Sequence, residues 1–192
     1  MKLVLATHNK GKIREFQKVF SEIGWEAVPV ADVSDAPDPE ETGKTFKENA
    51  LQKAHYYAKV TNLPVLSDDS GIIADVLGDR PGVYSARYAG GEGHNAEANM
   101  QKLLQNMQGV QNRKAQFRTA ICLILDGKKH LFEGIVKGEI IKEKRGSSGF
   151  GYDPIFVPEG YTKTFAELGN ETKNKISHRA LAVEKLCRFL KA

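Results

Sequence analysis

Two hydrophobic patterns alternate along the first third of the chain. Continuous apolar runs are typical of buried strands, whereas apolar residues that recur every three or four positions indicate helices with one buried face. Glycine, proline and acidic residues separate these segments and mark turns. The expected elements are a strand over residues 3–6, a helix over 13–23, a strand over 25–30, a helix over 45–61 and a short strand over 64–66. This order predicts a βαβαβ unit, whose ligand site lies at the carboxyl ends of the strands.

The pattern changes in the second half of the chain. A further apolar run covers residues 72–77, and a polar helix is expected over 95–107. Two long extended patterns, 117–125 and 130–144, are joined by Asp126-Gly127, which favours a hairpin turn. A Gly/Ser loop, a short strand over 155–157 and a closing helix over 177–190 complete the chain. We therefore expect an α/β fold with an antiparallel extension that forms a second lobe.

Composition places the chain among ordinary globular proteins. Its 192 residues suit one domain or two joined lobes, and 41% of them are hydrophobic. A net charge of +4 suits an anionic ligand, but no dense Lys/Arg run indicates nucleic acid binding. The longest apolar run, 120–125, is too short to cross a membrane, and no signal peptide is apparent. Two distant cysteines are consistent with a reducing cytoplasm, where we expect the protein.

Two adjacent carboxylates, Asp68 and Asp69, follow the strand at 64–66, where we expect the chain to enter a loop. Ionised groups beside a buried strand lose hydration unless a cation, a donor or water replaces it. A divalent metal is one candidate. The alternative is an Asx turn, because Asp-Asp-Ser-Gly is also common turn chemistry.

Residues 7–12 lie between the first strand and its helix, where backbone N–H groups and the helix dipole favour phosphate. The alternative is that Thr7 or Asn9 only caps the helix and that Lys10 and Lys12 are solvated. In the acidic loop 31–43, Glu40 or Glu41 could supply a second metal ligand or simply face solvent. Lys53, on the helix that follows, faces either the site or solvent.

Two further segments carry candidate binding groups. Phe150, Gly151, Tyr152 and Asp153 combine aromatic rings with a carboxylate, which suits a nucleobase pocket, although the rings could equally lie in the core. Lys173, His178 and Arg179 are expected at the start of the closing helix. Cations are unfavourable there, so they indicate recruitment for an anion or a carbonyl oxygen, or else solvated charge.

Five motifs in this order resemble the inosine triphosphatase family, the pyrophosphatases that hydrolyse XTP, ITP and dITP to monophosphate and pyrophosphate. The resemblance covers almost the whole chain. The motifs are Thr7-x-Asn9-x-x-Lys12-x-x-Glu15, Ser67-Asp68-Asp69-Ser70-Gly71, Pro81-Gly82-Val83-Tyr84-Ser85-Ala86-Arg87, Phe150-Gly151-Tyr152-Asp153-Pro154 and Ile176-Ser177-His178-Arg179. Two positions depart from the commoner family pattern, since His8 and Ser148 stand where smaller residues are frequent.

The resemblance implies one domain over residues 1–192, of α/β class, with a long mixed β-sheet flanked by helices and an active-site cleft between two lobes. It implies Mg²⁺ as cofactor, a small-molecule nucleoside triphosphate as substrate and a homodimer, with no nucleic acid or membrane partner. Asp69 would be the catalytic residue, and Asp69 and Glu40 the metal ligands. The implied substrate-binding residues are Thr7, His8, Asn9, Lys10, Gly11, Lys12, Ser70, Phe150, Gly151, Tyr152, Asp153, Lys173, His178 and Arg179.

Several alternatives stay open at this point. An ordinary aspartate is a poor base at neutral pH, so either Asp68 raises the pKa of Asp69 or a metal-bound water is the nucleophile. Donors from His178 or Arg179, with Asp153 as acceptor, would favour a 6-oxopurine over adenine. The competing functions are a pyrophosphatase for other modified nucleotides and a nucleotide sensor without turnover.

Overall fold

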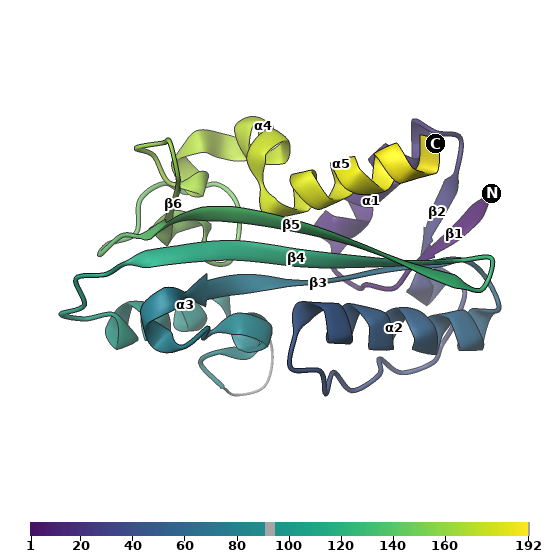
Figure 1. The fold of residues 1–192 in the computed structure, drawn as a ribbon, viewed down its shortest axis with the longest axis horizontal. Coiled ribbons are helices and arrows are strands. Elements are labelled where there is room, and N and C mark those ends of the chain that lie inside the picture. The colour runs from purple at the N-terminus through teal and green to yellow at the C-terminus, as the bar shows by residue number, and fades with distance from the viewer. Residues whose placement is uncertain (91–94, 192) are drawn as a thin grey trace. The chain divides into compact units, whose positions relative to one another are not determined.

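Six strands form a sheet in the order β2-β1-β3-β4-β5-β6 in this computed structural model, which describes residues 1–90 and 95–191 (Figure 1). The strands are β1 Lys2–Leu5, β2 Glu26–Pro29, β3 Val65–Ala74, β4 Lys114–Leu125, β5 Lys128–Ile140 and β6 Phe156–Pro158. The α-helices are α1 Lys10–Ser21, α2 Phe46–Thr61, α3 Ala96–Asn106, α4 Phe165–Ile176 and α5 His178–Lys191. Short 3-10 helices are η1 Val30–Asp32, η2 Asp75–Leu77, η3 Gly82–Arg87 and η4 Asp153–Ile155.

The chain divides into two compact units. Unit 1 comprises Met1–Asp69, Ala120–Phe132 and Lys185–Ala192, and unit 2 comprises Ser70–Thr119 and Glu133–Glu184. The division falls within β3, β4, β5 and α5, so the hairpin predicted from Asp126-Gly127 belongs to unit 1 at its tip and to unit 2 at its base. The expectation of a cleft between two lobes stays a prediction.

Unit 1 is built on the predicted βαβαβ pattern. β1 pairs in parallel with both β2 and β3, which places β1 between them. α2 begins with a capping box in which Thr45 and Glu48 bond each other's backbone N–H, and it lies along β3 (Figure 1). The hydroxyl of Ser67 donates to the carbonyl of Ala50 at 2.5 Å, and this bond fixes α2 against the strand.

Unit 2 surrounds an aromatic and aliphatic core. Phe117 packs edge-on against Phe156, with ring centroids 4.7 Å apart, and both lie close to Phe165. β6 pairs antiparallel with the end of β5, so the sheet is mixed, as predicted. α4 begins with a second capping box, Thr164 and Glu167, and is kinked at Gly169, where φ is 76°.

Three sequence expectations are wrong. β3 is one strand of ten residues rather than two short strands with a loop between them, so Asp68 and Asp69 lie inside the strand. α4 was not expected at all. Consequently Lys173 lies near the end of α4 and not at the start of the closing helix, and a cation at that end of a helix is favourable. None of the helices within the described ranges is long and apolar enough to cross a bilayer.

Candidate functional site

Asp68 and Asp69 meet different partners, because successive side chains of a strand point to opposite faces. The Asp68 carboxylate is 1% exposed and pairs with the ammonium of Lys12, on α1, at 2.8 Å. The Asp69 carboxylate accepts a hydrogen bond of 3.0 Å from the amide of Asn49, on α2. The two neighbours are therefore held by two different helices, and both lie within a strand rather than in the turn that was the alternative.

The environment of Asp69 favours its protonated form. Burial, and to a lesser extent the Glu41 carboxylate, raise the pKa of Asp69 from 3.8 to about 6, against the opposite effect of Asn49, Lys53 and Lys12. Asp68, which the sequence suggested as the cause, is not among the causes of this shift. A carboxyl group with a pKa of about 6 is far better matched to proton transfer near neutral pH than an ordinary aspartate.

Glu41, rather than Glu40, lies beside Asp69. The Glu41 carboxylate pairs with Lys53 at 2.5 Å, and the Lys53 ammonium also donates to the backbone carbonyl of Asp68 at 3.3 Å. Burial lowers the pKa of Lys53, but Glu41 and both aspartates outweigh burial, so the net pKa is raised. Glu40, which we expected as the second metal ligand, is exposed to solvent.

These carboxylates fit a hard divalent cation that retains water. Two carboxylates, Asp69 and Glu41, repel each other, and a cation relieves that repulsion. Within the described residues, no three His, Cys, Asp or Glu side chains converge as a complete metal cage. Mg²⁺ does not need such a cage, because it is bound through one or two carboxylates together with substrate phosphates and water.

The loop at residues 7–12 has the geometry of a capped helix start. The side chain of Asn9 accepts from the N–H groups of Gly11 and Lys12, at 2.9 and 3.1 Å, and the hydroxyl of Thr7 accepts from the N–H of Asn9. Asn9 therefore caps the helix, as the alternative to phosphate binding predicted. Lys10 is exposed and Lys12 is directed to Asp68, so the lysines differ in their surroundings.

His8 connects this loop to the acidic loop that carries Glu41. Its ring nitrogen lies 3.3 Å from the carboxylate of Asp38, and that carboxylate also accepts a hydrogen bond of 2.6 Å from the buried hydroxyl of Tyr57. Burial and the Asp38 carboxylate both raise the pKa of Tyr57. A smaller residue at position 8 would leave the two loops without this contact.

In unit 2 the two aromatic residues of the motif at 150–154 have different roles. Phe150 is 57% exposed, whereas Tyr152 is 5% exposed and donates to the backbone carbonyl of Ser85 at 2.7 Å. Gly151 lies between them with φ 63°, a left-handed conformation that reverses the side-chain direction and favours glycine. Only Phe150 therefore offers a ring to a ligand, while Tyr152 belongs to the core.

The remaining candidates in unit 2 are buried. Asp153, Lys173, His178 and Arg179 are between 2% and 7% exposed, which rules out solvated charge. The His178 ring stacks on Phe117, with centroids 4.8 Å apart and planes inclined by 9°. The Arg179 guanidinium donates to the hydroxyl of Ser70 at 3.4 Å. Ser70 directly follows Asp69 in β3.

Sequence reasoning missed one residue of the acidic group and left a second undecided. Asn49 is fully buried, donates to Asp69 and accepts a hydrogen bond of 2.8 Å from the N–H of Gly43. Lys53 was left open between the site and solvent, and in the structure it pairs with Glu41. Both lie one turn apart on α2, on the side that faces β3, so their helical spacing is the signal that could have found them.

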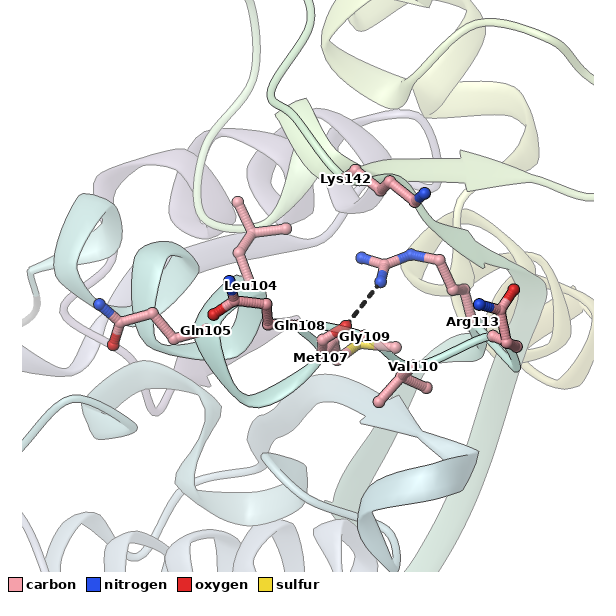
Figure 2. Close-up of a pocket in the computed structure, with 9 residues that line it drawn as sticks. Leu104, Gln105, Met107, Gln108, Gly109, Val110, Arg113 and Lys142 are labelled. Atoms are coloured by element: carbon pink, nitrogen blue, oxygen red, sulfur yellow. Dashed lines mark hydrogen bonds between the residues drawn. The ribbon is translucent and has the colours of Figure 1, made fainter.

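Two surface cavities in unit 2 are separate from these groups. One, of about 410 Å³, is lined by residues of α3 and the segment that follows it, and Figure 2 shows Arg113 directed to the backbone of Met107 there. The guanidinium donates to two further carbonyls, those of Ile140 and Ile141. The other cavity, of about 540 Å³, lies along β6 and the edges of β4 and β5. Neither contains a residue expected to bind substrate.

The fold and the site define an α/β protein with carboxylates and lysines grouped on β3, α1 and α2, a combination suited to a polyanionic ligand and a divalent cation. Residues 3–189 match the model of the Ham1 family. The chain belongs to the Ham1 family.

Relatives match over nearly their full length. The chain is 46% identical to the dITP/XTP pyrophosphatase of Bacillus subtilis (98% of this chain, 96% of that protein) and 50% identical to that of Porphyromonas gingivalis (98% and 97%). The structure of the Staphylococcus aureus Ham1 protein superimposes with a TM-score of 0.93 at 41% identity, covering 100% of this chain and 98% of that one.

Proposed function

We propose that this protein is a dITP/XTP pyrophosphatase, which hydrolyses non-standard purine nucleoside triphosphates such as XTP, ITP and dITP to the monophosphate and pyrophosphate. Water supplies the oxygen, and the anhydride bond between the α and β phosphorus atoms breaks. The half-buried Asp69 carboxylate, with its raised pKa, is the observation that carries the proposal. Near full-length relatives that bear this activity in their names support it. Removal of these triphosphates would keep their bases out of DNA and RNA.

Residues of unit 1 bind the triphosphate in this proposal. Lys10, Lys12 and the loop at 7–12 neutralise and position the phosphates, because phosphoryl transfer depends mainly on positioning and charge compensation. Asp69 and Glu41 hold Mg²⁺, which, when bound, would neutralise phosphate charge and lower the pKa of water. Lys53 fixes the Glu41 carboxylate and the backbone at Asp68.

Asp69 accepts a proton from the attacking water in the same proposal. With no metal bound, its pKa of about 6 leaves it mostly ionised at pH 7.5 and yet basic enough to take up a proton, whereas a bound Mg²⁺ would lower that pKa. Asn49 orients the carboxylate through the hydrogen bond to one of its oxygens. Asp68 has a different role, since it holds Lys12 and does not tune Asp69.

Residues of unit 2 recognise the base. The exposed ring of Phe150 stacks on the purine, and His178 and Arg179 offer N–H donors to the O6 acceptor of a 6-oxopurine. Adenine presents an amino group at that position, so a donor would face the donors of His178 and Arg179, a mismatch that can reach roughly 10⁴-fold in discrimination.

The test is a product analysis with a substrate panel. Purified protein is incubated with Mg²⁺ and ITP, XTP, dITP, ATP or a modified pyrimidine triphosphate, and the phosphate products are resolved. We expect monophosphate and pyrophosphate from the 6-oxopurines and little product from ATP. Release of orthophosphate would refute the cleavage site, and preference for pyrimidines would refute the base assignment. A homodimer is part of the same proposal, and light scattering of the purified protein tests it.

A further inference from the structure

One carboxylate oxygen organises the loop that carries Phe150. Oδ2 of Asp153 accepts a hydrogen bond of 2.8 Å from the N–H of Phe150 and lies 2.5 Å from the ammonium of Lys173. A side chain at Gly149 would collide with this carboxylate, and φ at Gly149 is 81°, so the loop closes tightly around it. Asp153 is 2% exposed. Its carboxylate is therefore already bonded to groups of the protein.

Lys173 lies under the Phe150 ring. Its ammonium is 4.2 Å from the centroid of Phe150 and 5.9 Å from that of Phe165. Phe165 is fully buried and packs on Phe156, with centroids 5.4 Å apart. A cation over a ring face is attracted by the ring quadrupole, and the attraction is stronger where water is excluded. Lys173 thus connects the exposed ring to the rings of the core.

The charge of Lys173 is compensated within the loop. The lysine is 7% exposed, and Asp153 supplies the countercharge at close range. A lysine that neutralises a polyphosphate must present its ammonium to the ligand. This ammonium is covered by Phe150 on one side and by Phe165 on another.

We infer that Asp153 and Lys173 are positioning residues that act through Phe150: they hold the ring so that its exposed face stacks on the purine, and neither is a ligand of the phosphates. This inference rests on the proposed function, because it takes the purine triphosphate as the ligand. It assigns to Lys173 a role different from that of Lys10 and Lys12.

A second contact supports the same role. The hydroxyl of Ser148 donates to the backbone carbonyl of Ala166 in the first turn of α4, the helix that carries Lys173. The loop is therefore attached to α4 on both sides of Phe150, at Ser148 and at Asp153. An exposed ring attached in this way retains one orientation before the ligand arrives, which lowers the entropy cost of binding.

The inference is tested by a double-mutant cycle on binding. Phe150→Leu, Lys173→Met and the double variant are made in an Asp69→Asn background, so that ITP binds without turnover, and binding is measured by calorimetry with ITP and with inorganic tripolyphosphate. Each single change should weaken ITP binding about tenfold, and the double variant should also weaken it about tenfold, not about a hundredfold. Tripolyphosphate binding should stay within about threefold of the parent protein.

Two outcomes would overturn the inference. If the double variant loses ITP affinity by the product of the two single losses, Lys173 contacts the ligand independently of Phe150. Weaker tripolyphosphate binding by Lys173→Met would identify Lys173 as a phosphate ligand. Intact ITP binding without pyrophosphate release by the unmodified enzyme would refute only the proposed function.

Controls separate positioning from folding. Lys175→Met removes an exposed lysine from the same helix, where it pairs with Glu171, and should leave both ligands unaffected. Lys173→Met leaves the buried Asp153 carboxylate without its countercharge and could therefore fail to fold. In that case the double variant Asp153→Asn, Lys173→Met, in which both side chains are uncharged, replaces it in the cycle. An asparagine at 153 can still accept from the Phe150 N–H, so partial rescue of ITP binding by this pair is expected. No rescue, in a pair shown to be folded, would contradict the inference.

Discussion

The two groups of candidate residues hold their buried cations in different ways. In unit 1, Lys12 and Lys53 are paired with the carboxylates of Asp68 and Glu41. In unit 2, Lys173 has one carboxylate partner and two aromatic rings, and His178 stacks on a third ring. The first arrangement offers carboxylates that suit a metal ion and ammonium groups that suit a phosphate. The second has a fixed geometry, which suits recognition of a flat base.

The largest effect is expected from Asp69→Asn. The change preserves size and the hydrogen bond from Asn49 but removes the proton acceptor and a metal ligand, so pyrophosphate release from ITP should fall by about 10³-fold or more. Turnover by the purified variant measures this, with circular dichroism to show that it folds. A rate within tenfold of the unmodified enzyme would exclude Asp69 from the chemistry.

A large loss of stability is expected from Lys12→Met. The change removes the ammonium that pairs with a carboxylate buried to 1% exposure, and breaking such a pair typically costs about 3–5 kcal/mol in the free energy of unfolding. Urea denaturation gives the value. Lys10→Met is the matched control, since Lys10 is exposed on the same helix and its loss should cost less than about 0.5 kcal/mol.

Asp69 should also make stability depend on pH. Its folded-state pKa of about 6 is above the value of 3.8 for an exposed carboxyl, so the folded protein binds more protons between these values and loses stability as pH rises through about 6. Asp69→Asn should therefore be more stable than the unmodified protein at pH 8, by up to about 3 kcal/mol, and equal to it below about pH 4. Thermal unfolding of both proteins in the presence of a chelator at several pH values measures this difference in stability. A difference that does not change with pH would contradict the prediction.

The smallest effect is expected from Phe150→Ala. An aromatic platform for one base contributes about 1–3 kcal/mol, so the KM for ITP should rise about tenfold or more, while kcat changes little. Tyr152→Phe is the contrasting variant, because it removes a core hydrogen bond to Ser85 and should lower stability without altering the KM. A shift of the KM in both variants would mean that loop structure, rather than stacking, controls substrate binding.

Much of the fold could be predicted because periodicity and turn chemistry are local. The parallel β2-β1-β3 arrangement and the Asp126-Gly127 turn follow from short segments of sequence. α4 could not be predicted as readily, since Gly169 interrupts it with a left-handed residue in the middle of its helical pattern. The continuity of β3 was hidden because two acids and a glycine usually favour turns, whereas here contacts with α1 and α2 stabilise the two acids within the strand.

The candidate site shows the same limit. Motif order named Asp69, the loop at 7–12 and the buried cations of unit 2 as candidates. It could not distinguish Glu40 from Glu41, because adjacent acids in a loop look alike until the loop is folded. Nor could it separate the exposed Phe150 from the buried Tyr152, since that distinction depends on the left-handed Gly151 between them.

The unbroken course of β3 has a consequence for how this gene can change. Because alternate residues of a strand point to opposite sides, deleting the codon for Ser67 would move Asp69 to the place of Asp68, beside Lys12, and Ser70 to the place of Asp69, beside Asn49. Composition and charge would hardly change, yet the carboxylate beside Asn49 would be lost. Length variation among descendants of this protein should therefore be found in its surface loops and be absent from this segment.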